Sequence, residues 1–260
     1  MNLFEALILG LVQGLSEFLP ISSSGHLVLL QNIFGITDDV LFFDTMLHVG
    51  TLIAVMAVFY KAIWEMLKKP LQKKVYLFVC ATVVTAVFAL LLEDKIEALF
   101  GGGLLGVGFL ITSLILLLSE RIKKGKHDIE QMNYLQAAGV GLMQTVALLP
   151  GVSRSGSTIA GSRFFGLNKD AAAEFSFILS IPPILGSLLL QFKNVAEEGM
   201  PSISLLNVAA GTLTAAISGY FAIRWMLKLI KNKSLMGFAV YTGVLGLLVT
   251  LDQYVTHFFF

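Results

Sequence analysis

The chain has 260 residues, of which 56% are hydrophobic and only 13% are charged, and its mean hydropathy is +0.83. This composition is too apolar for an ordinary soluble domain and places the protein in a lipid bilayer. The formal net charge is +1, and no basic arm or interleaved aromatic patch is present, which excludes nucleic acid as a partner.

The first predicted element, residues 3–35, is long enough for two short helices but is broken in the middle. Pro20 and the run Ser22-Ser23-Ser24-Gly25 interrupt it. Non-helical backbone at membrane depth is tolerated only where it is buried in protein or faces water. We therefore predict a re-entrant helical hairpin. A second unit of this kind is predicted at residues 134–166, with its break at Pro150-Gly151.

Three apolar segments follow each broken unit. Crossing the hydrocarbon layer takes about 20 predominantly apolar residues in a helix. The segments that meet this requirement are 44–64, 75–92, 104–120, 171–192, 203–227 and 235–256. The sequence thus predicts six transmembrane helices and two re-entrant hairpins.

The second broken unit repeats the first at an offset of 131 residues, which brings Gln13 onto Gln144 and Gly25 onto Gly156. Three crossings separate the two units, and an odd number reverses the direction of the second. We expect an all-α polytopic membrane protein with one integral domain, residues 1–260. It would contain two inverted-topology repeats, 1–130 and 131–260, each a re-entrant hairpin plus three transmembrane helices.

Basic residues gather in the loops of one predicted side, which the positive-inside rule makes cytoplasmic. Both chain termini are then expected outside. These residues are Lys61, Lys68, Lys69, Lys73 and Lys74, then Arg121, Lys123, Lys124 and Lys126, then Lys228, Lys231 and Lys233.

The first unit carries candidate metal and catalytic residues. Gln13 and Glu17 are four positions apart and share one helical face. Their amide and carboxylate oxygens are ligands that suit Mg²⁺ or Ca²⁺. The alternative is that Glu17 forms a structural ion pair, for instance with Arg154. His26 follows three serines and is a candidate catalytic residue. The other histidines, His48, His127 and His257, are interpreted as structural or solvated.

The second unit contains a candidate phosphate site at Ser153-Arg154-Ser155-Gly156-Ser157-Thr158. Serine and glycine at a helix start present N–H groups and hydroxyls to an anion, and the helix dipole favours it. Arginine adds a planar fork that can hold two phosphate oxygens. The alternative is an ordinary turn with an arginine at the lipid headgroups. The repeat aligns Arg154 with Ser23, so both units are expected to line one pocket.

The stretches Gln13-Gly14-Leu15-Ser16-Glu17-Phe18-Leu19-Pro20-Ile21-Ser22-Ser23-Ser24-Gly25-His26 and Pro150-Gly151-Val152-Ser153-Arg154-Ser155-Gly156-Ser157-Thr158 resemble two signature motifs. The family is that of the bacterial undecaprenyl-diphosphate phosphatases, also known for bacitracin resistance. The resemblance implies hydrolysis of C55 isoprenyl diphosphate to the monophosphate at the outer face of the plasma membrane, with a divalent cation. This reaction recycles the carrier lipid for cell wall synthesis. The motif match gives functional positions to Glu17, Ser23, His26, Ser153, Arg154 and Thr158.

Residues and resemblance together predict a membrane phosphatase. Glu17 with Gln13 would hold Mg²⁺ or Ca²⁺, and His26 would act as general base or nucleophile, with Ser23 as the rival nucleophile. The residues expected to bind phosphoryl oxygens are Arg154, Ser22, Ser153, Ser155, Ser157 and Thr158. The alternative function is an inverted-repeat transporter of an anion or a lipid phosphate. The expected partners are the lipid substrate and the bilayer, and a homodimer is compatible with the sequence but not indicated by it.

Overall fold

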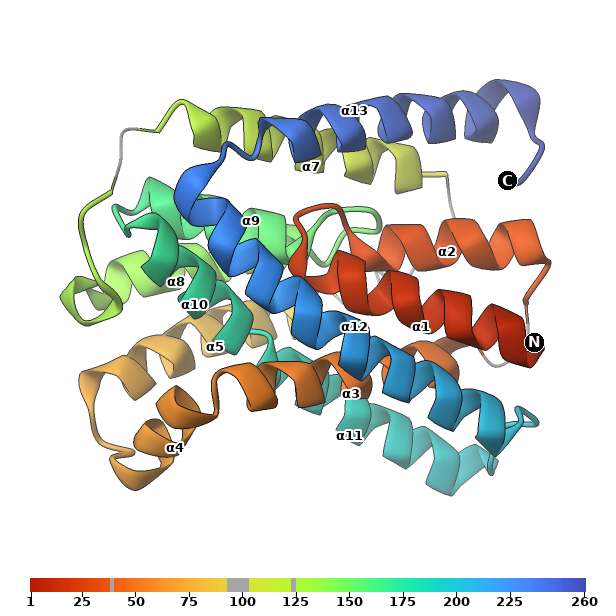
Figure 1. The fold of residues 1–260 in the computed structure, drawn as a ribbon, viewed down its shortest axis with the longest axis horizontal. Coiled ribbons are helices and arrows are strands. Elements are labelled where there is room, and N and C mark those ends of the chain that lie inside the picture. The colour runs from red at the N-terminus through yellow and green to blue at the C-terminus, as the bar shows by residue number, and fades with distance from the viewer. Residues whose placement is uncertain (38–39, 93–102, 123–124) are drawn as a thin grey trace.

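The computed structural model describes residues 1–37, 40–92, 103–122 and 125–260, and all regular elements in these ranges are helices (Figure 1). The predicted all-helical class is confirmed. Lys123 and Lys124 of the predicted basic loops lie outside the described residues. The elements are α1 (Leu3–Phe18), α2 (Ser23–Phe34), α3 (Val40–Val58), α4 (Tyr60–Lys68), α5 (Lys73–Leu91), α7 (Leu105–Glu120), η1 (Ile129–Gln131), α8 (Tyr134–Val146), α9 (Arg154–Phe164), α10 (Lys169–Ile178), α11 (Ile181–Glu198), α12 (Leu205–Asn232), α13 (Met236–Leu251) and η2 (Asp252–Thr256).

Five helical segments of the described chain are long and apolar enough to cross a membrane, so the protein is a multi-pass membrane protein. They are Val40–Val58, Lys73–Leu91, Lys169–Glu197, Leu205–Asn232 and Met236–Thr256. The sixth predicted span, 104–120, corresponds to α7, which is apolar but has only 16 residues.

One predicted span had a wrong boundary, and another is built from two helices. The predicted span 44–64 is divided, because α3 ends at Val58 and the separate helix α4 begins at Tyr60. The predicted span 171–192 consists of α10 and α11. The helix is interrupted before Pro182 and Pro183, since proline has no N–H to donate and its ring crowds the preceding turn.

The two broken units each fold as a pair of helices joined by a turn. In Figure 1, α1 runs inward from the end that carries both termini and α2 returns to it, whereas α8 and α9 run inward and back from the opposite end. Matching serines cap the second helix of each pair. Ser22 Oγ accepts from Gly25 N at 3.3 Å, and Ser153 Oγ accepts from Gly156 N at 3.1 Å. The cap chemistry of both turns is therefore repeated along with the sequence.

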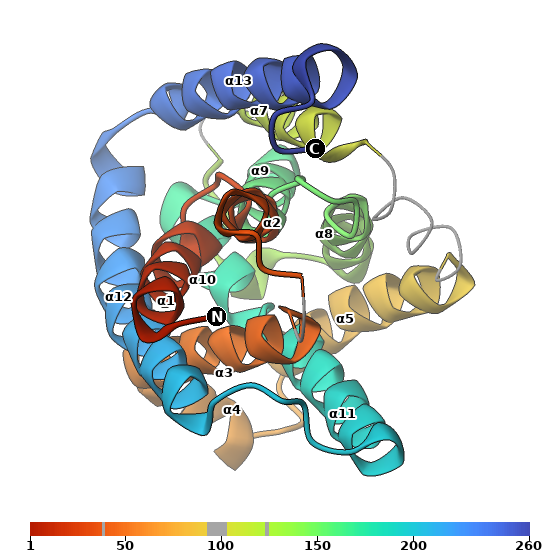
Figure 2. The ribbon, with the colours of Figure 1, turned by 90° about the vertical axis from the view of Figure 1, so that its right-hand side faces the viewer.

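Helix α1 lies directly against α12 (Figures 1 and 2). Glycines allow this close approach, as is common between helices in membranes. A Cβ at Gly10 would collide with the backbone of Gly211, and a Cβ at Gly14 would lie 2.5 Å from Ala215 O. The contact fixes α1 and so the direction in which its last turn presents Glu17.

A hydrophobic cluster joins the turns of the two pairs. Phe18 at the end of α1 packs edge-on against Phe177 of α10, with ring centroids 5.5 Å apart. Ile159 of α9 and Leu116 of α7 belong to the same buried cluster. Helices from both halves of the sequence therefore share one core beside the two turns.

Candidate active site

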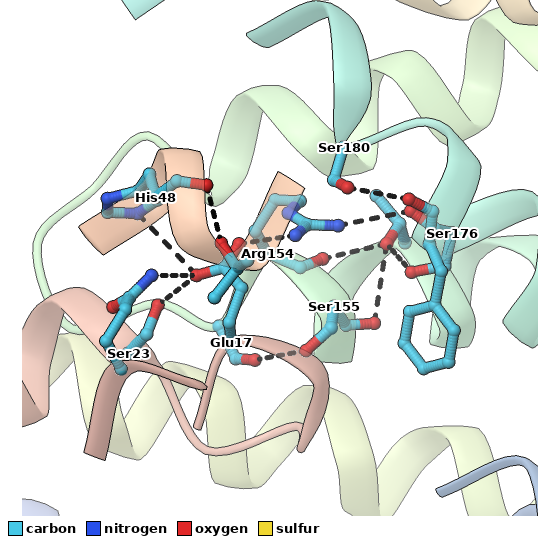
Figure 3. Close-up of polar contacts among 12 residues, drawn as sticks. Glu17, Ser23, His48, Arg154, Ser155, Ser176 and Ser180 are labelled. Carbon is cyan, nitrogen blue, oxygen red and sulfur yellow. Dashed lines mark hydrogen bonds and ion pairs between the residues drawn. The ribbon is translucent and has the colours of Figure 1, made fainter. Parts of the chain in front are cut away.

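A buried ion pair joins the two turns. Glu17 lies in the last turn of α1, and Arg154 is the first residue of α9. Arg154 Nη2 donates to Glu17 Oε1 at 2.5 Å, with 6% of the glutamate side chain and 18% of the arginine side chain exposed (Figure 3). The predicted alternative, pairing of these residues, is what the structure contains. A buried charge is stable only when it is paired, so each turn depends on the other.

The second oxygen of Glu17 is also surrounded by polar groups. Ser23 Oγ donates to Glu17 Oε2 at 2.5 Å, and Gln13 Nε2 donates to it at 3.1 Å. Gln13 is fully buried, and its Oε1 has no hydrogen-bond partner among the described residues. Three residues that the sequence singled out in the first unit, Gln13, Glu17 and Ser23, therefore meet at one carboxylate.

His48 of α3, interpreted from the sequence as structural or solvated, also reaches Glu17. Its Nε2 lies 3.6 Å from Glu17 Oε2, and its Nδ1 bonds to Asp44 O at 2.7 Å. A signal was present in the sequence. Asp44 and His48 are four residues apart in an apolar span, where ionisable residues mark functional sites.

Arg154 makes a second contact that the sequence did not indicate. Its Nη1 donates to Ser176 O at 3.1 Å, near the interruption between α10 and α11. The hydroxyl of Ser176 bonds to Thr158 Oγ1 at 2.6 Å (Figure 3). The two terminal nitrogens of the guanidinium are thus bound to different partners, Nη1 to Ser176 and Nη2 to Glu17, and these two contacts orient the guanidinium plane.

Most of the predicted phosphate-binding hydroxyls are buried and support the turns. Ser22 and Ser153 cap α2 and α9, and Ser155 Oγ donates to Leu19 O at 3.0 Å. Thr158 Oγ1 bonds within α9 and to α10, and Ser157 Oγ is buried without a hydrogen-bond partner among the described residues. The partly exposed polar groups of the site include Ser23, His26, His48 and Arg154.

His26 lies one turn along α2 from Ser23, on the same helical face. The described hydrogen bonds of its ring do not involve Glu17 or Arg154. Its Nδ1 bonds to Ser22 O at 2.7 Å, and its Nε2 bonds to Tyr241 Oη of α13 at 2.7 Å. Tyr241 is a further neighbour that sequence reasoning missed, because it lies 215 residues away in a segment of apolar character.

The arrangement suits a phosphorylated ligand. The N-termini of α2 and α9 lie at the two joined turns, and helix N-termini favour anions through free N–H groups and the helix dipole. In the described part of the chain, no cluster of three or more His, Cys, Asp or Glu could hold a metal ion. Glu17 and the unpartnered Gln13 Oε1 would nevertheless offer two oxygen ligands. They fit a cation such as Mg²⁺, which commonly takes one or two carboxylates and completes its shell with water and substrate phosphates.

Comparisons with known proteins agree with the motifs. The family described as bacitracin resistance protein BacA matches residues 6–248. The undecaprenyl-diphosphatase of Carboxydothermus hydrogenoformans is 46% identical over 256 residues, which cover 97% of this chain and 98% of that protein. Undecaprenyl-diphosphatase 4 of Bacillus thuringiensis is 41% identical over 260 residues, which cover the whole of both chains. The undecaprenyl-diphosphatase of Alkaliphilus metalliredigens is 40% identical and covers 96% of this chain and 98% of its own length.

A double-mutant cycle tests the ion pair between the turns. Glu17→Gln and Arg154→Gln should each lower the free energy of unfolding in detergent by about 3 kcal/mol, because each leaves one buried charge unpaired. The double variant should be less destabilised than the sum of the two, with a coupling of about 1–3 kcal/mol. Denaturant unfolding followed by tryptophan fluorescence provides the measurement.

The exposed pair Lys193 and Glu197, 3.8 Å apart, is the control for this cycle. Its side chains are 68% and 62% exposed, so its coupling should not exceed about 0.5 kcal/mol. A coupling between Glu17 and Arg154 as small as that of the control pair would contradict the structural role of the buried contact.

Proposed function

The chain belongs to the bacitracin resistance protein BacA family, and we infer from this membership that it is an undecaprenyl-diphosphate phosphatase. It hydrolyses the phosphoric anhydride of the lipid diphosphate to the monophosphate and free phosphate. The observation that carries this conclusion is the identity of 40–46% to undecaprenyl-diphosphatases over nearly the whole chain. The joined helix N-termini and Arg154 supply the anion site that such a reaction requires.

In our mechanism, Arg154 changes partner when the substrate binds. Its guanidinium is paired with Glu17 in the resting site and would transfer to the oxygens of the outer phosphoryl group. Phosphoryl transfer depends mainly on positioning and on stabilising negative charge. The free N–H groups at the N-termini of α2 and α9 would help to stabilise the same negative charge. The buried hydroxyls of the two turns would shape the phosphate site and reach the phosphate only where the turns open. These hydroxyls belong to Ser22, Ser153, Ser155, Ser157 and Thr158.

Ser23 is our candidate nucleophile, because its hydroxyl already donates to Glu17 Oε2 at 2.5 Å. Attack by Ser23 Oγ forms a bond to the outer phosphorus and breaks the anhydride P–O bond, whose electrons leave with the lipid monophosphate. The serine proton passes to Glu17. Water then forms a bond to the phosphorus of the phosphoserine and gives one proton to His26, while the Ser23 O–P bond breaks and Ser23 Oγ takes its proton back from Glu17. In the alternative route, water attacks the outer phosphorus directly, His26 acts as the base and no phosphoserine forms. In both routes, His26 takes a proton from the water whose oxygen ends up in the released phosphate.

We further propose a divalent cation, Mg²⁺ or Ca²⁺, in this site. Glu17, while it is ionised, and Gln13 would hold it together with the oxygens of the diphosphate, and the bound ion would neutralise part of the substrate charge. The buried Gln13 Oε1 without a partner supports this assignment.

We propose that the chain is a single domain built from two inverted repeats, 1–130 and 131–260, whose re-entrant hairpins meet at the active site. The opposite directions of the α1–α2 and α8–α9 pairs support this architecture (Figure 1). The protein would lie in the bacterial plasma membrane with its active site facing outward, and the prenyl tail would enter laterally from the bilayer. The basic residues near α4, α5 and the C-terminal end of α12 support a cytoplasmic position for the end of the molecule opposite the two chain termini.

Arg154→Lys in purified protein tests the function and the phosphate clamp together. Lysine keeps the positive charge but loses the planar fork, so kcat for phosphate release from C55 diphosphate should fall about 100-fold or more. KM should change much less. The assay uses matched detergent micelles, in which no gradient exists to drive transport.

Lys193→Arg, on an exposed part of α11, is the matched control and should keep the kcat of the unchanged protein. An Arg154→Lys enzyme with a normal kcat would remove the clamp from the mechanism. Absence of phosphate release from the unchanged protein would favour the transporter alternative.

Glu17→Gln tests the cation site, because the amide keeps the shape of the side chain and removes the charge that binds a hard cation. We expect kcat to fall at all Mg²⁺ concentrations and the Mg²⁺ concentration for half-maximal activity to rise at least tenfold. Isothermal titration of Mg²⁺ with a non-hydrolysable diphosphate analogue present should show the same loss of affinity. An unchanged Mg²⁺ titration would sink the assignment of Glu17 as a ligand.

Cysteine labelling tests the orientation. In a Cys80→Ala background, Lys69→Cys should be protected from a membrane-impermeant maleimide on intact cells, whereas Phe258→Cys should react. Both positions are well exposed, at 69% for the Lys69 side chain and 80% for Phe258, so access depends on the side of the membrane. Reaction of Lys69→Cys with protection of Phe258→Cys would reverse the topology.

A further inference from the structure

We propose that Tyr241 is a positioning residue of the active site. Its hydroxyl donates a hydrogen bond to the reactive nitrogen of the neutral His26 ring, and it accepts a hydrogen bond from that nitrogen once His26 has taken up a proton. The inference rests on the proposed function. Tyr241 lies on α13, far in sequence from both motifs that carry the rest of the site.

The hydrogen bonds of His26 identify which nitrogen can react. Ser22 O can only accept a hydrogen bond, so the Nδ1 atom 2.7 Å away must carry the ring hydrogen. The remaining nitrogen, Nε2, then has the only free lone pair of the neutral ring. Tyr241 Oη lies 2.7 Å from this atom and must be the donor. The phenol therefore occupies the one position on His26 from which a proton can be accepted.

The Ser22 turn indicates that this orientation of His26 is imposed by the fold. Ser22 has a φ of 71°, in a region that residues other than glycine rarely occupy. Strained backbone of this kind persists where the surrounding structure determines it, and it is common at active sites. In this conformation, Ser22 O accepts from the backbone N of His26 at 3.2 Å as well as from its ring.

Two aromatic rings from other helices complete the enclosure of His26. Phe109 of α7 packs edge-on against the imidazole, with centroids 5.4 Å apart, and the Tyr241 ring is nearly parallel to it at 5.7 Å. A Cβ at Gly25 would lie 2.5 Å from Phe109 Cζ, so the glycine lets α2 approach α7 this closely. The two rings thus restrict the orientation of the imidazole, and its Nε2 points at the Tyr241 hydroxyl, which can either donate or accept a hydrogen bond.

A tyrosine hydroxyl suits both protonation states of His26, because it can donate and accept. In the resting site it donates to the Nε2 lone pair. When water attacks phosphorus, the Tyr241 hydroxyl hydrogen first rotates away and frees the Nε2 lone pair. The water oxygen forms the new P–O bond, the bond to the leaving oxygen breaks with its electrons, and the water proton passes to Nε2. Tyr241 Oη then accepts the new N–H. This keeps the ring in place while water gains access beside the phenol.

Tyr241→Phe tests this role, because phenylalanine keeps the ring packing and removes only the hydroxyl. We expect kcat for phosphate release to fall about tenfold with a change in KM of less than twofold. The second measurement is the rate of carbethoxylation of His26 by diethyl pyrocarbonate, followed by peptide mass spectrometry at a pH above neutrality. This rate should rise several-fold, because the reagent attacks an unprotonated nitrogen that the phenol covers. His127 and His257 serve as internal references.

Tyr254→Phe, at an exposed tyrosine of the same C-terminal region, is the control and should change neither measurement. Thermal unfolding shows whether both variants keep the fold. A kcat that falls without faster labelling of His26 would overturn the proposal, because Tyr241 would then act other than through His26. Faster labelling with an unchanged kcat would overturn it as well, because the contact would have no part in the reaction. If the unchanged protein releases no phosphate, the proposed function itself fails.

Discussion

The ion pair between Glu17 and Arg154 is the contact on which the arrangement of the site depends. Glu17 lies in the last turn of α1 and Arg154 begins α9, and the buried interior of the described chain holds many polar but few charged side chains. An unpaired charge in such surroundings would be strongly destabilising, whereas the pair satisfies both residues at once. The pair comes from opposite halves of the sequence, so the two turns cannot separate without exposing a buried charge. A ligand that replaces one partner, as an anionic phosphoryl group would, must therefore compete with a strong internal contact.

Small residues and helix caps make this pairing geometrically feasible. Gly10 and Gly14 bring α1 against α12, and Gly25 brings α2 against α7. Ser22 and Ser153 satisfy N–H groups at the starts of α2 and α9, which would otherwise be left without partners away from water. The hydroxyls in the second motif thus have a structural task in the resting protein. Binding of phosphate would use the N–H groups and the arginine that these caps hold in place.

Several features of the site followed from local sequence patterns. The spacing of Gln13 and Glu17 placed both on one helical face, and the structure brings them within 3.1 Å. The two breaks in apolar sequence marked the turns, and the motifs identified the family. The boundary of one span was wrong and a second span contains a break, because a hydropathy pattern does not distinguish one long helix from two helices with an interruption. The contact between His48 and Glu17 did not follow from a local pattern, because the carboxylate comes from another helix.

The sequence by itself determined the class of the protein, its helical character, the positions of its two turns and the family to which it belongs. These depend on composition and on contacts between residues a few positions apart, which the chain specifies locally. Only the tertiary structure decided that Ser176 orients Arg154 and that Tyr241 covers His26. Those contacts depend on how α10 and α13 pack, and packing in a bilayer is set by shape and small residues rather than by a polarity pattern. A tyrosine in an apolar helix therefore gives no sign of its partner until the helix is placed beside it.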